Sequence, residues 1–96
     1  MTLRDKLKAL TEPSREVDVE IAKSFDEVSL YFTASLDATV ELVEREMPGW
    51  WWALERVEVE HWAYIGGDTS CVEARRKHKL PAVALLLALL EAKGIE

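Results

Sequence analysis

Residues 80–90 read Leu-Pro-Ala-Val-Ala-Leu-Leu-Leu-Ala-Leu-Leu, and this segment determines how the rest of the chain can pack. It is apolar throughout, and Gly94 follows as a signal for the end of a helix. A helix that is apolar all round has to be buried all round. The stretch is also too short to cross a bilayer, which needs about 20 apolar residues. It therefore predicts a central core helix that needs neighbours on two sides.

Amphipathic helices upstream can supply part of that cover. We expect helices over residues 2–10 and 14–24, and a third from Ser35 to the Pro48-Gly49 pair. In each, apolar residues recur at the three- and four-residue spacing of one helix face. The hydroxyl of Ser35 suits an N-cap, and proline followed by glycine ends the third helix. On the second helix the charged side chains, Asp18 among them, are expected to face water.

The spacing of apolar residues changes after Gly49 from that of a helix to that of a strand. Residues 57–61 alternate between apolar and charged, as in a strand with one exposed face. We expect antiparallel strands over about 50–55 and 57–65, and a short third strand around 71–74. Alternation places Trp50 and Trp52 on one face and Trp51 on the other. No Asn-Gly or Asp-Gly pair occurs near residues 55–57, so the register stays open.

Length and composition define one small folded domain. The chain has 96 residues, 49% of them hydrophobic and 31% charged, which is typical of a globular protein with a single core. The predicted fold class is α+β: a layered helix–sheet–helix sandwich with a small antiparallel sheet of two to three strands and a buried C-terminal helix. Cys71 is the only cysteine and the N-terminus lacks the apolar stretch of a signal peptide, so we expect a cytoplasmic protein.

Negative charge is concentrated in the middle of the chain. The net charge is -6, and residues 12–60 hold thirteen acids against four bases. A general nucleic-acid binder neutralises phosphates with Lys and Arg, so this balance disfavours that class of protein.

Three stretches resemble a known family. They are YFTASLDATVELV (31–43), PGWWW (48–52) and LPAVALLLALLEA (80–92), and they are similar to the phage ABA-sandwich domain, found in short phage and prophage proteins of unknown function. That family has a Tyr-Thr-x-Ser-Leu-Asp-Ala-Ala helix start, a Gly-Trp-x-Trp strand and a closing Thr-Pro-Ala-Leu-Ala-Leu-Cys helix. Here Phe32 separates Tyr31 from Thr33, and Leu80 replaces the threonine before Pro81. The resemblance covers about residues 14–94, leaves helix 2–10 as an accessory, and implies a phage origin and a layered fold. It offers no catalytic residues to transfer and leaves the function open.

Trp51 and the central acids form the first candidate site. The tryptophans can be core residues, or Trp51 can anchor a partner protein, because tryptophan dominates binding hot spots. The acids can simply keep the protein soluble, or they can compete for the Lys- and Arg-lined channels of RNA-guided effector complexes. The candidate partner-binding residues are Glu41, Glu44, Glu46, Trp51, Glu55, Glu58 and Glu60.

The basic run before the last helix is the second candidate site. Its residues are Arg75, Arg76, Lys77 and Lys79, with His78 among them. Positive charge at this end opposes the helix dipole, and an anion held by Arg76 or Lys79 and the N–H groups of residues 81–84 would relieve it. Alternatively the run is a solvated loop, or it pairs with the acidic middle of a second copy.

The sequence contains no known catalytic or metal-binding motif. His61, His78 and Cys71 are the only soft metal ligands and do not have a zinc spacing, so we expect no metal and no cofactor. A Gly-rich phosphate loop, a nucleophile elbow and a His-centred triad are all absent from the sequence. We do not expect an enzyme.

These observations favour a binding protein. The leading hypothesis is a small accessory protein of a phage or mobile element that binds a host protein stoichiometrically in the bacterial cytoplasm. Its sharpest form is inhibition of a CRISPR effector or another defence complex. The alternative is a homodimeric structural or assembly protein of a phage. Neither hypothesis involves a membrane or direct binding of nucleic acid.

Overall fold

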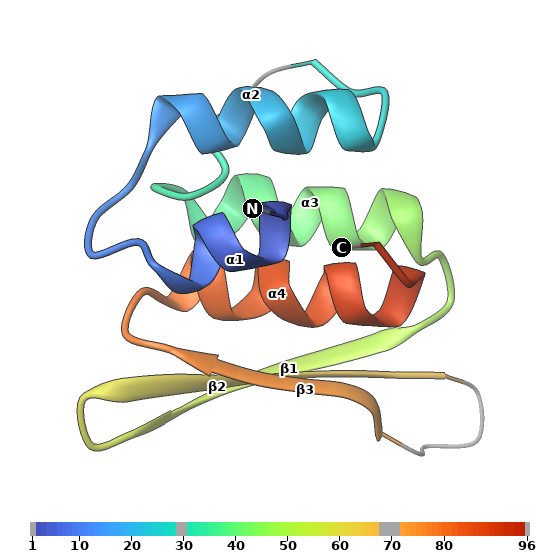
Figure 1. The fold of residues 1–96 in the computed structure, drawn as a ribbon. Coiled ribbons are helices and arrows are strands. Elements are labelled where there is room, and N and C mark those ends of the chain that lie inside the picture. Colours follow the sequence, from blue (N-terminus) through green and yellow to red (C-terminus); the bar gives the residue numbers. More distant parts are fainter. Residues whose placement is uncertain (1, 29–30, 68–71, 96) are drawn as a thin grey trace.

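The computed structural model describes residues 2–28, 31–67 and 72–95, which form four helices and three strands. The helices are α1 (Leu3–Lys8), α2 (Arg15–Ser24), α3 (Leu36–Glu46) and α4 (Pro81–Lys93), and the strands are β1 (Trp51–Val57), β2 (Glu60–Gly66) and β3 (Val72–His78). The strands form one antiparallel sheet in the order β1-β2-β3. Figure 1 shows this sheet below α4, with the other helices above.

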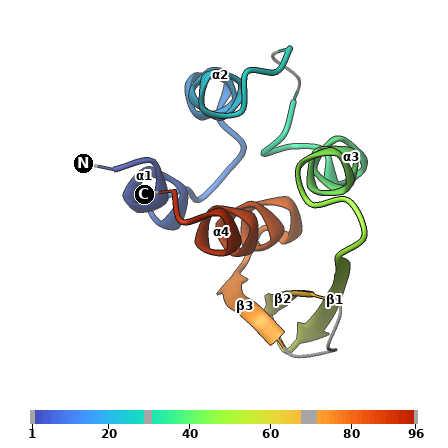
Figure 2. The same cartoon turned by 90° about the vertical axis from the view of Figure 1, so that its right-hand side faces the viewer.

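Helix α4 is the centre of the molecule, as its sequence predicts. Residues 82–90 are all buried, and α4 contacts β2 and β3 on one side and α1 and α3 on the other. Figure 2 shows α4 between the sheet and the outer helices. The helix ends at Gly94, whose left-handed backbone (φ 72°) suits a residue without a side chain.

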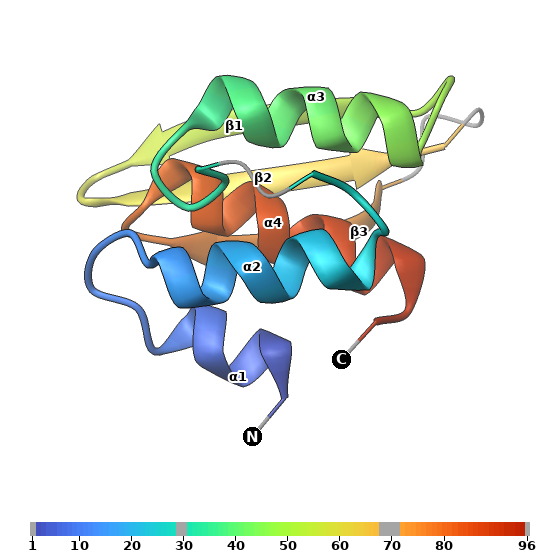
Figure 3. The same cartoon turned by 90° about the horizontal axis from the view of Figure 1, so that it is seen from above.

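The outer helices begin where their capping residues indicate. The hydroxyl of Ser14 accepts the N–H of Val17, and that of Ser35 accepts the N–H of Ala38. Helix α1 is shorter than expected but buries Leu3 and Leu7 in the same core. Seen from above, α2 and α3 flank the line of α4, and α3 runs over β1 (Figure 3).

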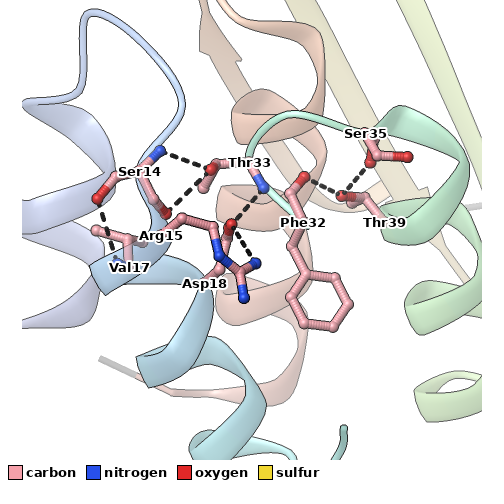
Figure 4. Close-up of polar contacts among 8 residues, drawn as sticks. All are labelled: Ser14, Arg15, Val17, Asp18, Phe32, Thr33, Ser35 and Thr39. Atoms are coloured by element: carbon pink, nitrogen blue, oxygen red, sulfur yellow. Dashed lines mark hydrogen bonds and ion pairs between the residues drawn. The ribbon is translucent and has the colours of Figure 1, made fainter. Parts of the chain in front are cut away.

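The expectation that Asp18 faces water is wrong. Only 1% of this residue is exposed, because its carboxylate holds the loop that leads into α3. Its Oδ1 accepts the N–H of Thr33 at 2.8 Å, and its Oδ2 lies 3.2 Å from Nη1 of Arg15. Figure 4 shows these contacts together with the N–H of Ser14, which donates to Oγ1 of Thr33 at 2.8 Å. A buried carboxylate is tolerated here because both oxygens have partners.

The position of the first turn of the sheet also differs from the expectation. Val57 pairs with Glu60, so the turn is Glu58-Val59 instead of lying near residues 55–57. A two-residue turn leaves the alternation of apolar and charged residues unbroken, which is why the sequence reads as one strand through it. Glu58 adopts a positive φ of 58°, which is uncommon for a glutamate.

The third strand is longer than expected and contains the basic run. It extends to His78, and its side chains alternate between the two faces, with Ala74 and His78 buried and Arg75 and Lys77 exposed. Residues 75–78 of the run are therefore part of a strand and not of a loop, and Lys79 follows the strand.

The predicted fold class is confirmed: α+β, with a small antiparallel sheet and a buried C-terminal helix packed on it. The layers follow in the order sheet, α4, outer helices. In the described part of the chain all helices lie on one side of the sheet, whereas the sequence predicts helices on both faces (Figures 1 and 2). The other face of the sheet has no helix over it within residues 2–28, 31–67 and 72–95.

Candidate functional site

The uncovered side of the sheet is an aromatic and charged surface. The strand register places Ala63, Ile65 and Ala74 on the side of α4, where all three are buried. The side chains of the residues that alternate with these along each strand point to the side of the sheet away from α4. We call this surface the outer face; its larger side chains are Trp51, Glu55, Glu60, Trp62, Tyr64, Arg75 and Lys77.

Contacts on the outer face hold its charged groups against its rings. The Arg75 guanidinium and the Lys77 ammonium lie 5.2 and 5.4 Å from the centre of the Trp62 ring, within cation–π range. Oη of Tyr64 donates to Oε1 of Glu55 at 2.6 Å, and this hydrogen bond raises the pKa of Tyr64. Trp62 and Tyr64 are half-buried, so their rings still meet solvent.

The tryptophans divide between the faces as their alternation predicts. Trp50 and Trp52 pack against the core, whereas Trp51 lies on the outer face and is half-buried. Its indole Nε1 is buried and has no hydrogen-bond partner among the residues that the structure describes.

The outward edge of β1 has no strand partner in the described residues, because β1 pairs with β2 alone. The strand contains neither proline nor lysine, and Arg56 is its one basic residue. The opposite edge of the sheet is β3, which carries Arg75, Arg76 and Lys77, and such basic side chains discourage further strand pairing. Of the two edges, that of β1 is the less protected.

The structure separates the predicted acidic residues into two groups. Glu41 and Glu44 are exposed on α3, in line with Asp37. Glu46 is half-buried and lies 3.7 Å from Nζ of Lys93. The second group belongs to the sheet: Glu55 on β1, Glu58 in the turn, and Glu60, which lies 3.7 Å from Nζ of Lys77.

The basic run is likewise divided. Arg75 and Lys77 belong to the outer face, whereas Nη2 of Arg76, on the side of α4, lies 2.9 Å from Oε1 of Glu91. Lys79 is exposed beyond the end of β3. The N–H of Leu80, the N-cap of α4, donates to Nδ1 of His78 at 3.0 Å.

A pocket of about 450 Å³ lies between the end of α1 and the end of β3, and sequence reasoning missed it. Lys8, Lys77 and Lys79 line it together with Glu60 and the buried His78. Burial lowers the pKa of His78, an effect opposed by the backbone carbonyl of Lys8. No local signal could reveal this pocket, because its walls are about 70 residues apart in the sequence.

Metal-binding geometry is absent from the part of the chain that the structure describes. Those residues contain no group of three or more His, Cys, Asp or Glu side chains that could hold a metal ion. Cys71 lies outside the described residues. Among the helices that are described, none has the length and apolar character needed to span a membrane.

Comparison with protein-family models, with curated proteins and with solved structures finds no match to this chain.

Proposed function

We propose that this protein acts by stoichiometric binding to another protein, with the free edge of β1 as its contact surface. The observation that carries the proposal is this edge, where a seven-residue strand has no partner strand among the described residues and lacks the lysines and prolines that block strand addition. An extended segment of a partner protein can pair with such an edge through its backbone, while its side chains supply specificity.

The charges beside the edge favour a basic partner. Glu55 lies on β1, Glu58 lies in the adjoining turn, and α3 lies on the same side of the molecule as β1 (Figure 2). Helix α3 adds exposed acids at residues 37, 41 and 44, which form no ion pair among the described residues. Complementary charge speeds encounter and excludes wrong partners. We therefore propose an extended segment rich in Lys or Arg as the bound element.

The resemblance to the phage ABA-sandwich domain suggests that the partner is a bacterial host protein. In the sharpest form of the proposal, the partner is a CRISPR effector or another defence complex. The acids would then occupy a basic channel that otherwise holds nucleic acid.

The test mixes the purified protein with RNA-guided effector complexes and measures both association and binding of target DNA. We expect association of one copy per complex and loss of DNA binding. The double variant E41K/E44K should weaken association at least about tenfold, equivalent to about 1.4 kcal/mol. E12K/E16K makes the same charge change at exposed positions next to and within α2 and should have little effect. If the protein associates with none of the effector complexes, the proposal that it inhibits a CRISPR effector is wrong. If both double variants lose the same amount of affinity, the acids of α3 have no specific role in binding.

A further inference from the structure

The outer face of the sheet carries a row of side chains that is complementary to itself. The register pairs Glu55 of β1 with Trp62 of β2, and Trp62 with Lys77 of β3. The row thus runs from an acid at one edge, through an indole at the centre, to a base at the other edge. If a second copy lies over the first with its row running in the opposite direction, the acid of each copy faces the base of the other.

We propose that a second copy of this chain docks on the outer face, with a twofold axis parallel to the strands. Rotation by 180° about an axis along β2 places β1 of one copy over β3 of the other. Glu55 of each copy then meets Lys77 of its mate, and the two Trp62 rings meet at the axis. An axis across the strands would place β1 over β1, so that Glu55 approaches Glu55, which like-charge repulsion opposes.

The chemistry of this surface suits a face-to-face contact. Sheets stack about 10 Å apart, and the side chains between them fill that space. Trp62 and Tyr64 supply apolar area at the centre, with Glu55, Arg75 and Lys77 around them. Aromatic centres with a charged rim are typical of protein interfaces.

The outer face is small for a protein–protein interface. Three strands of seven residues span about 23 Å along the strands and about 14 Å across them. This footprint is smaller than the ~800 Å² per partner of a standard interface. Small interfaces are typical of weak, transient complexes, so we expect a reversible dimer with a dissociation constant of roughly 10–100 µM.

A competing occupant is single-stranded nucleic acid, which stacks on aromatic rings beside basic side chains. Arg75 and Lys77 beside Trp62 provide such a platform. The net charge of -6 and the two acids at residues 55 and 60 on the same face disfavour a polyanion. Stacking through the face leaves the backbone edge of β1 free for the proposed function, and the two proposals share only the side chain of Glu55.

The experiment is sedimentation of the full chain from about 5 µM to about 500 µM, a range that brackets the expected dissociation constant. We expect the monomer to become a dimer within this range. Glu55→Lys and Lys77→Glu should each remain monomeric, because each puts like charges together at both ends of the row. An equimolar mixture of the two variants should form a dimer again, because only the mixed pair restores both acid–base contacts.

Controls separate this result from general charge effects. Both variants keep a net negative charge, so overall attraction between opposite charges does not bring them together. Glu58→Lys makes the same charge change in the turn and should dimerise like the parent. Circular dichroism establishes folding; if a charge reversal unfolds the chain, Glu55→Gln and Lys77→Gln replace the reversals and should each raise the dissociation constant.

Three results would overturn the proposal. They are a parent that stays monomeric throughout, variants that dimerise as well as the parent, and folded variants whose mixture remains monomeric. Binding of a labelled oligothymidine that is lost in Trp62→Ala, with no dimer of the parent, would assign the outer face to nucleic acid instead.

Discussion

Oδ1 of Asp18 accepts the backbone N–H of Thr33 at 2.8 Å, and both residues are buried. This bond joins α2 to the loop that enters α3, fifteen residues further along the chain. Asp18→Ala leaves the Thr33 N–H without an acceptor and Arg15 without this carboxylate, so we expect a loss of about 2–4 kcal/mol in the free energy of unfolding. Urea denaturation measures the loss, and Glu16→Ala, exposed on the same helix, is the control. A loss below about 0.5 kcal/mol would show that this bond does not stabilise the fold.

A second buried hydrogen bond joins the same loop to α3. Oγ1 of Thr39 lies 2.8 Å from the carbonyl oxygen of Phe32, whose side chain is fully buried. Thr39→Val keeps the shape of the side chain but removes the donor, so we expect a loss of about 1–2 kcal/mol. Thermal denaturation should show a fall in Tm of about 4–8 °C for each kcal/mol. An unchanged Tm would mean that another donor serves the Phe32 carbonyl.

Stability should fall on mild acidification because of His78. Burial lowers the pKa of this imidazole from its ordinary value of 6.5, so the unfolded chain takes up a proton at a higher pH than the folded protein does. Below pH 6.5, and down to the lowered pKa, the unfolded state binds more protons, and the free energy of unfolding therefore decreases as the pH falls. Protonation of Nδ1 would also displace the N–H of Leu80.

Urea denaturation at pH values on both sides of 6.5 measures this dependence. His78→Gln should lose the dependence in this range, whatever its absolute stability, and His61→Gln is the control. A parent protein with the same free energy of unfolding at all these pH values would contradict the assignment.

Burial of α4 predicts a sharp contrast between two substitutions. Leu86 is 1% exposed, and an aspartate there would place an unpaired charge in a closed interior, at a cost of several kcal/mol against a total stability of about 5–15 kcal/mol. We expect Leu86→Asp to prevent folding. Val59 is 69% exposed in the β1–β2 turn, and Val59→Asp should fold normally. Circular dichroism distinguishes the two outcomes, and a folded Leu86→Asp would mean that α4 is not central.

Patterns within single elements predict much of this fold. The apolar run of α4, the hydroxyl caps Ser14 and Ser35, and the alternation around Trp51 all report local geometry, and the structure agrees with each. The features that were missed depend on contacts between distant segments. Asp18 is buried because Thr33 needs an acceptor, and nothing near Asp18 in the sequence indicates that need.

The candidate site also combines features that local sequence patterns predict with features that depend on contacts between distant segments. The period of α3 predicts that Glu41, Glu44 and Glu46 face water, and the first two are exposed whereas Glu46 is half-buried beside Lys93. The period of β1 predicts the outward direction of Trp51. The pairing of Arg76 with Glu91, the row formed by residues 55, 62 and 77, and the pocket beside His78 all depend on the register of β3 and on the packing of α1. The register of β1 against β2, which also sets this row, is marked only weakly in the sequence, because the turn Glu58-Val59 continues the alternation of the two strands that it joins.

Hydrogen–deuterium exchange of the backbone amides can show whether α4 fills the interior and leaves binding to the outer surfaces. We expect amides of residues 85–90 to exchange only through global unfolding and to be the slowest in the chain, while the turn at Glu58 exchanges quickly. Rapid exchange along residues 85–90 would contradict this placement of α4.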